Sequence, residues 1–340
     1  MLDASFISML KKIIITLFAI VATSGQMFAS EEETHHEGDF IMHHVKDSHE
    51  WTIAKIGSAN LSIHLPIIIL SPDKGLEIFS SRYFFDLNHH SKSHSGYYLD
   101  TNDNIISKNK NRAFIDLSVT KNVASLFIGA MLMLGLFLYV AVKYKSKPSF
   151  TPRGMVALLE MIILFVKKDI VIPNIGETSA SRFMPYLLSI FFFIWINNLL
   201  GLLPAAANLT GNISVTLVLA VFTFLVTNFN ANKSYWKHIF RTPGVPLWLS
   251  PIMIPVELLG VFTKPISLII RLFANITAGH IILLSIINII FILKSPYVGF
   301  LSVPFGAFMF MLKLLVAFLQ AYIFTLLSAI YIGAAVESHH

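Results

Sequence analysis

Hydrophobic residues along the chain fall into long runs that are separated by short polar clusters. Three of these runs have the length of single helices and cover residues 123–142, 184–203 and 213–226. A helix needs about 20 apolar residues to cross the hydrocarbon core of a bilayer, which is roughly 30 Å thick. The pattern therefore predicts three membrane-spanning helices, of which the third is a little short.

The last hundred residues contain two much longer apolar runs, 251–291 and 298–332, with a turn at 294–296 between them. A helix rises about 1.5 Å per residue, so forty residues exceed the thickness of a bilayer. The first run is either two spans or one steeply tilted helix, and the second matches it across the turn. We expect an all-α polytopic membrane protein with about five crossings, including a long tilted two-helix hairpin.

The first thirty residues have the pattern of an export signal. Lys11 and Lys12 precede a stretch of nine residues, 13–21, that is apolar except for Thr16, and small residues and then acidic ones follow. Nine residues are too few to span a membrane but suit the apolar region of a signal peptide. We predict a signal peptide at 1–30, cleaved after Ser24 or Ser30; the alternative is a first transmembrane helix. The following segment would then begin in the periplasm, outside a bacterial inner membrane.

Residues 31–117 are polar and rich in His, Asn and Ser. Short strand-like runs at 61–70 and 96–99 are separated by turn signals at 71–75 and 102–104. We predict a small, partly β periplasmic extension, followed by a membrane-embedded domain at 118–340. Its histidines lack the paired spacing of a defined zinc site, so we expect no metal site there. These histidines are His35, His36, His43, His44, His49, His64, His89, His90 and His94.

Composition and charge agree with the membrane class. Of the 340 residues, 55% are hydrophobic and only 13% charged, whereas about a quarter are charged in soluble domains. The net charge of +6 comes from short basic clusters beside the apolar runs, which argues against nucleic-acid binding. Clusters after the first and third runs place those ends in the cytoplasm, the N-terminus in the periplasm and the C-terminus in the cytoplasm. The chain has no Cys, which excludes disulfides and thiolate sites.

Arg271 lies inside the first long apolar run. A charged guanidinium in hydrocarbon costs about 3 kcal/mol on insertion scales, so such residues usually face protein or water and carry a function. The alternative, an arginine that reaches the membrane surface, needs a nearby helix end, and apolar sequence continues on both sides. We therefore interpret Arg271 as functional.

Helical spacing groups the neighbouring polar residues around Arg271. Ser267 and Asn275 lie four residues to either side and share its face, whereas His280, nine residues on, points the opposite way. Two further residues fall near the arginine stripe if Pro265 does not shift the helical phase: Lys264 and Glu257. In the last run, two polar residues share a face seven residues apart: Lys313 and Gln320. Helix-to-helix hydrogen bonding explains the uncharged residues but not the arginine.

The run from Lys264 to His280, Lys-Pro-Ile-Ser-Leu-Ile-Ile-Arg-Leu-Phe-Ala-Asn-Ile-Thr-Ala-Gly-His, resembles the signature of subunit a of the F-type ATP synthase. The resemblance covers about 118–337 and includes Ile-Pro-Val-Glu-Leu-Leu-Gly at 254–260, Leu-Gln-Ala-Tyr-Ile-Phe-Thr-Leu-Leu at 319–327 and Asn-Asn-Leu-Leu-Gly-Leu-Leu-Pro at 197–204. Phe-Ile-Met-His-His at 40–44 is also similar to a short N-terminal motif of the family.

The resemblance implies a membrane stator that is not an enzyme by itself and holds no cofactor. Its long tilted helices would embrace a rotating c-ring, with the b subunits of the peripheral stalk and the lipid bilayer as its other partners. Arg271 would be the essential arginine that faces the ring carboxylates. Ser267, Asn275, Glu257 and Lys264 would belong to the cytoplasmic half-channel. The periplasmic half-channel would hold Asn198, His280, Gln320 and Lys313.

Lys313 departs from the family pattern, which often has an acidic residue or a histidine at this position. Either the relay runs through His280 and water, or Lys313 itself titrates. The c-ring would set the choice between H⁺ and Na⁺, and a histidine relay favours H⁺. Two other classes stay open: a secondary transporter, for which inverted repeats are expected but not seen, and a His-rich metal sensor, which would leave Arg271 unexplained.

Overall fold

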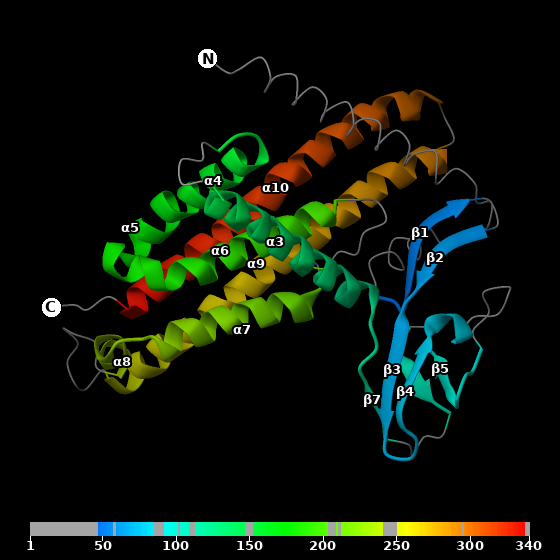
Figure 1. Ribbon diagram of the computed structural model, residues 1–340, viewed down its shortest axis with the longest axis horizontal. Helices are drawn as coiled ribbons and strands as arrows, with labels where there is room; N and C mark the ends of the chain where they lie inside the picture. The colour runs from blue at the N-terminus through cyan, green and yellow to red at the C-terminus, as the bar shows by residue number, and fades with distance from the viewer. Residues whose placement is uncertain are drawn as a thin grey trace. The chain divides into compact units, whose positions relative to one another are not determined.

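The computed structural model (Figure 1) describes residues 47–56, 59–84, 92–100, 103–108, 113–146, 152–202, 209, 212–240, 250–293 and 296–336. The predicted signal segment, 1–30, lies outside these residues, as do His35, His36, His43, His44, His89 and His90. Contacts divide the chain into two compact units. The first contains the strands, the start of α3 and residues 279–313, and the second contains most of the helices.

The predicted partly β extension is confirmed. It consists of short elements with the bounds β1 Glu50–Ile56, β2 Ala59–His64, β3 Pro66–Ser71, β4 Gly75–Ser80, a 3₁₀ turn Ser81–Phe84, β5 Tyr97–Leu99, β6 Ile105–Ser107 and β7 Ile115–Asp116. The strand-like run 61–70 is divided at Leu65 between β2 and β3. The turn signal at 71–75 connects β3 to β4, with Ser71 paired to Gly75.

All strand pairs in the extension are antiparallel. The strands form a β1-β2 hairpin, a three-stranded sheet in the order β4-β3-β7 and a β5-β6 hairpin. Ile67 and Ile69 of β3 pack with Tyr97 of β5 in a small core, because alternate residues of a strand face the same side. This core positions the β5-β6 hairpin against one face of the three-stranded sheet.

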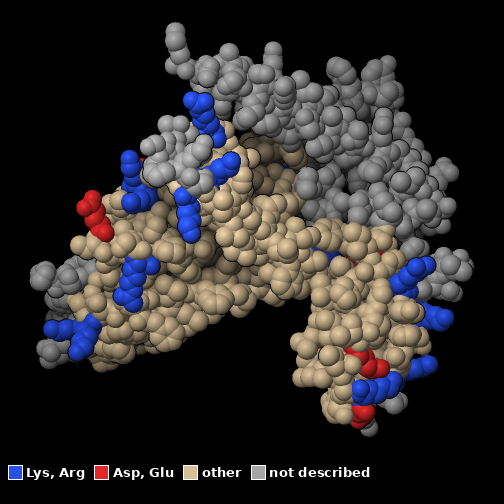
Figure 2. All heavy atoms as spheres, viewed as in Figure 1, with Lys and Arg blue, Asp and Glu red and all other residues tan. Residues whose placement is uncertain are grey.

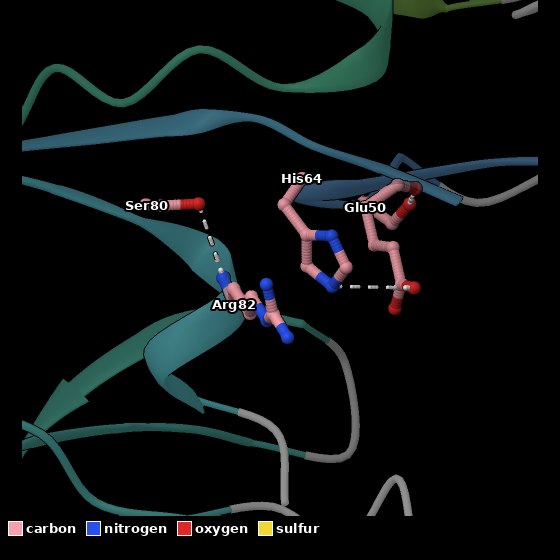
Figure 3. A network of polar contacts seen from close by, with 5 residues as sticks. Glu50, His64, Ser80 and Arg82 are labelled. Atoms are coloured by element: carbon pink, nitrogen blue, oxygen red, sulfur yellow. Dashed lines mark hydrogen bonds and ion pairs between the residues drawn. The ribbon is translucent and has the colours of Figure 1, made fainter. Parts of the chain in front are cut away.

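A polar cluster connects side chains of the β1-β2 hairpin (Figure 3). Glu50 is paired across the hairpin with His64, and His64 Nε2 lies 3.9 Å from Glu50 Oε1. Nearby, the backbone N–H of Arg82 donates to Ser80 Oγ at 3.4 Å, and the Arg82 side chain points toward this cluster. Among the described residues, no group of three or more potential metal ligands is found.

The helices have the bounds α3 Lys121–Ser146, α4 Met155–Phe165, a π-helix Val166–Val171, α5 Ile172–Ile175, α6 Glu177–Leu200, α7 Ile213–Phe229, α8 Lys233–Phe240, α9 Ser250–Leu293 and α10 Pro296–Val336. Within the described residues, four helices are long and apolar enough to span a membrane, or five if the bent pair α7 and α8 is one span. The prediction of about five crossings is confirmed. The tilt of the hairpin in the membrane stays a prediction.

Helix α6 forms the centre of the helical unit. Half of its candidate membrane span is buried, against 11% for the span in α9. Phe191, Phe192 and Leu187 of α6 are fully buried and contact a core that extends to α4, α7, α9 and α10. The ends of this unit are also fixed, because the N–H of Asn232 donates to the carbonyl of Ala335 at 2.8 Å near the end of α10.

Three features differ from the hydropathy pattern or resolve it. The run 251–291 is one helix, α9, which continues through Pro255 and Pro265, and α10 continues through Pro304. The segment 155–175, for which the pattern predicted no element, is helical up to Gly176, whose positive φ of 84° ends it. The third span is longer than predicted and bends by 101° into α8.

Candidate functional site

Arg271 lies at the border between the packed and the open face of α9. Leu268 lies about one turn before Arg271, and Leu272 directly follows it. Both leucines are buried in the helical core. Ile270 is 60% exposed, and Ala274 is exposed as well. Arg271 itself is half-buried, and no ion pair among the described residues involves its guanidinium. Arg271 is thus a cation at the edge of an exposed apolar stretch of α9.

Ser267 and Asn275 lie one turn to either side of Arg271, and both are exposed. Because α9 is continuous, helical spacing puts them on the same side as the arginine. The Nδ2 of Asn275 donates to Oε1 of Gln320 at 3.1 Å, and Gln320 on α10 is only 2% exposed. The resemblance assigned these two residues to opposite half-channels, whereas the structure joins their side chains.

Asn198 connects α6 to α10. Its Nδ2 donates to the carbonyl oxygen of Ala317 at 3.2 Å, in a buried position. Ala317 precedes Gln320 by three residues, so both face the same side of α10. The structure therefore brings Asn198, Gln320 and Asn275 along one stretch of α10.

Lys264 lies two turns before Arg271 and contacts two aromatic rings. Its Nζ lies 5.3 Å from the ring centre of Tyr331 on α10 and 5.9 Å from that of Tyr235 on α8. Glu257 lies close enough to Lys264 to act on its charge, as expected from their seven-residue spacing. The charge of Arg271 in turn reaches Tyr331. Lys264 thus connects α9 to the last turns of α10 and to α8.

A small cavity lies beside Lys264. It is lined in part by Thr223, Thr227 and Asn228 of α7 and by Tyr235 and Tyr331, and its volume of about 10 Å³ is near the lower limit for one water molecule. Threonine hydroxyls, tyrosine hydroxyls and an ammonium group can hold such a water by hydrogen bonds. The cavity thus has polar walls next to Lys264, the residue that the resemblance assigns to the cytoplasmic half-channel.

Sequence reasoning missed a second polar network. The hydroxyl of Tyr186 on α6 lies 3.0 Å from Thr223 Oγ1, which lies 3.4 Å from Ser328 Oγ on α10. It also missed Tyr331. Threonines spaced seven and four residues apart on α7, at 216, 223 and 227, were a signal that this helix has a polar side.

Lys313 belongs to the other compact unit and is half-buried. Its Cε lies 3.6 Å from the position that a Cβ would take at Gly279, so the lysine stem packs on the backbone of α9. The side chain of His280 lies outside the described residues, so the choice between a relay through His280 and water and a relay through Lys313 stays a prediction.

Comparison with known proteins identifies the helical part. Residues 123–333 match the ATP synthase A chain family, and residues 40–125 match a domain of unknown function, DUF8433. The chain is 39% identical to ATP synthase subunit a of Anaeromyxobacter sp. (strain Fw109-5), over 92% of this chain and 74% of that protein. It is 39% identical to ATP synthase subunit a 2 of Chlorobaculum tepidum, over 92% and 76%.

A third relative, ATP synthase subunit a of Chlorobium phaeobacteroides (strain BS1), is 49% identical over 66% of this chain and 68% of the relative. The identity is thus higher over a shorter stretch. The family match covers more than half of the chain and includes the residues of the Arg271 site. Together with the four to five candidate membrane spans within the described residues, these matches place the protein in the ATP synthase A chain family as a multi-pass membrane protein.

Proposed function

We propose that this chain is the proton-translocating stator subunit of the membrane sector of an F-type ATP synthase. The observation that carries the proposal is the state of Arg271, a half-buried cation in an apolar helix without a carboxylate partner among the described residues. An unpaired charge inside a membrane is costly, so a partner outside the chain is needed. A ring of c subunits that carry carboxylates supplies such a partner.

A fixed cation beside a ring carboxylate favours the charged form of that carboxylate, which promotes release of its proton. The same charge repels protons and blocks a direct leak between the two sides of the membrane. Each proton that crosses 100 mV of potential releases about 2.3 kcal/mol, which drives the ring. Arg271 would therefore couple proton flow to rotation, while ATP chemistry takes place in other subunits.

Two half-channels would lead to the ring. Ser267 and Asn275, with Lys264 and Glu257, would serve the cytoplasmic path. The Tyr235 hydroxyl and the water-sized cavity beside Lys264 support a polar route on that side. The periplasmic path would use Asn198, His280, Lys313 and Gln320.

The hydrogen bond between Asn275 and Gln320 joins one residue assigned to each path. A proton barrier is needed near this bond, since a chain of polar groups could otherwise conduct directly. Arg271, one turn from Asn275 on the same side of α9, provides a positive charge at that place.

The entry relay has two arrangements that variants can separate. If the relay runs through His280 and water, His280→Ala stops proton flux and Lys313→Gln leaves it intact. If Lys313 itself carries the proton, both variants stop the flux. Flux measured in inverted membrane vesicles at several pH values decides between these arrangements.

The proposal also covers placement in the cell. The chain would lie in a bacterial inner membrane, with a signal peptide at 1–30, a periplasmic extension at 31–117 and an embedded domain at 118–340. The mature N-terminus would be periplasmic and the C-terminus cytoplasmic. Lys143 and Lys145 lie in the last turn of α3, and basic residues beside a membrane span favour the cytoplasmic side. The c-ring and the b subunits would be its protein partners.

The test is Arg271→Ala in the assembled synthase. We expect loss of ATP-driven proton pumping and of respiration-driven ATP synthesis, with normal amounts of assembled complex in the membrane. Arg82→Ala is the matched control, because Arg82 is an exposed arginine of the extension and its removal should leave both activities intact. Coupled ATP synthesis that persists in Arg271→Ala would refute the proposal.

A further inference from the structure

The three-stranded sheet of the extension has a second apolar face that its core does not use. The register places six aliphatic side chains in two rows across the strands. One row is Leu76, Leu70 and Ile115, and the other is Ile78, Ile68 and Leu117, whose N–H donates to the carbonyl of Ile68 at 2.9 Å. The remaining positions of this face, Pro66 and Ser80, carry no charge either.

Several side chains of this face are exposed, as the described residues show. Leu76 is 59% exposed and Ile78 is 64% exposed, while Ile67 and Ile69 on the opposite face are fully buried. An antiparallel sheet with one face in water normally has polar residues there. Contiguous exposed apolar residues mark an interaction surface. In the view of Figure 2, the charged side chains of this part of the chain gather at its lower end and right side.

The sheet is joined to a membrane span without a flexible linker. Leu117 and Lys121, the first residue of α3, are four residues apart, which is at most about 14 Å of extended chain. The N–H of Lys121 donates to the carbonyl of Ser48 at 2.9 Å, and that of Asn122 to Asp47 Oδ1 at 3.2 Å. The apolar face is therefore held close to the point where α3 enters the bilayer.

We propose that this face, which we call the aliphatic face, lies on the surface of the lipid bilayer from which α3 emerges. The α3 helix has a candidate membrane span that is only 17% buried, as expected of a helix that faces lipid. Its composition favours lipid over a protein partner, since protein interfaces are enriched in aromatic residues, Met and Arg, and this face consists of Leu and Ile.

A β-sheet can lie with its apolar face on the surface of a bilayer. Apolar faces of peripheral elements insert about 5–10 Å into the boundary between headgroups and acyl chains. At that depth the outer edges of β4 and β7 still reach headgroups and water, so their backbone groups stay hydrogen-bonded; in the hydrocarbon core they could not. The extension would thus be anchored twice, by α3 and by the aliphatic face. This inference requires that α3 spans the membrane and is independent of the role of Arg271.

Site-directed spin labelling tests the inference. The chain has no Cys, so Leu76→Cys, Ile78→Cys and Ser93→Cys each give one labelling site in this subunit. Ser93 is the control: it is exposed and lies beside β5, which packs on the other face of the sheet. The assembled synthase, without other reactive cysteines, is placed in vesicles of phosphatidylethanolamine and phosphatidylglycerol. Collisions of the label with oxygen, which enters lipid, and with a water-soluble nickel complex are then compared.

We expect labels at Leu76 and Ile78 to collide mainly with oxygen and the label at Ser93 to collide mainly with the nickel complex. A second variant, Ile78→Glu with the label at Leu76, should shift that label toward the behaviour of Ser93. If Leu76 and Ile78 are reached by the nickel complex as easily as Ser93, the face is in water and the inference is wrong. If both reagents are excluded, a protein covers the face, and the inference is wrong as well.

Discussion

Gly333→Ala would test how closely the end of α10 packs against the helical segment before α6. A Cβ added at Gly333 would lie 1.9 Å from the carbonyl oxygen of Asn174 and 2.9 Å from its carbonyl carbon. Ordinary van der Waals contact begins at about 3.4 Å, so the two backbones would have to separate by about 3.4 − 1.9 = 1.5 Å. No rotamer change can relieve this contact, because both partners are backbone or Cβ atoms.

Two effects of opposite sign set the size of the change. Replacing Gly by Ala in a helix stabilises it by up to about 1 kcal/mol. Overpacking a closely packed contact costs about 1–3 kcal/mol. For Gly333→Ala the clash is with backbone and should prevail, giving a net loss of up to about 2 kcal/mol. The shift should also lengthen the hydrogen bond from Asn232 to Ala335, which is 2.8 Å.

Thermal unfolding of the purified subunit complex in detergent measures this effect, with ATP-driven proton pumping as a second readout. Gly135→Ala on α3 is the matched control, because nothing lies within 4 Å of a Cβ at that position. We expect a lower unfolding temperature and weaker pumping for Gly333→Ala, and an equal or higher unfolding temperature for Gly135→Ala. If both variants are as stable as the unaltered protein, the close approach of α10 to Asn174 is wrong.

Three further predictions concern contacts near Arg271. In a double-mutant cycle of proton flux and stability, Asn275→Ala and Gln320→Ala should show a coupling energy of about 0.6 kcal/mol and at most about 1.7 kcal/mol. This is the range for hydrogen bonds between membrane helices. Additive effects of the two substitutions would contradict the 3.1 Å bond. Lys264→Met should destabilise the complex by about 0.5–2 kcal/mol, because the cation–π contacts of the ammonium group with Tyr235 and Tyr331 are lost. Lys264→Arg should retain most of that stability, and equal losses in both variants would argue against the ring contacts. Asn198→Leu should cost about 0.5–1.5 kcal/mol in thermal unfolding, because its amide bonds a buried carbonyl, and an unchanged unfolding temperature would contradict that bond.

Much of the fold could be predicted because the membrane sets the length of each helix. Runs of about twenty apolar residues are rarely found outside membrane-spanning helices. Helices α3, α6 and α7 cover the three single-helix runs of the hydropathy pattern. The pattern could not decide whether 251–291 is one helix or two, since Pro265 is compatible with a break or with continuation. It also gave no sign of the helical segment 155–175, where Lys167, Lys168 and Asp169 interrupt the apolar run.

The arrangement around Arg271 could be predicted only within α9. Helical spacing relates Ser267, Arg271 and Asn275 because they belong to one regular element. The contact of Asn275 with Gln320 depends on the register of α9 against α10, and periodicity within a helix contains no information about that register. Tyr331 was missed for the same reason: its ring meets Lys264 only through packing of the two helices.

The central claim is that the partner missing from Arg271 is a carboxylate of the c-ring, and cross-linking measures this contact most directly. Because the chain has no Cys, Ile270→Cys can be combined with a cysteine placed beside the ring carboxylate, and disulfide formation can be followed in native membranes. Phe222→Cys on α7 is the control, since Phe222 is 56% exposed and Ile270 60%. We predict a cross-link from Ile270 and none from Phe222. A ring cross-link from Phe222 but not from Ile270 would contradict the account.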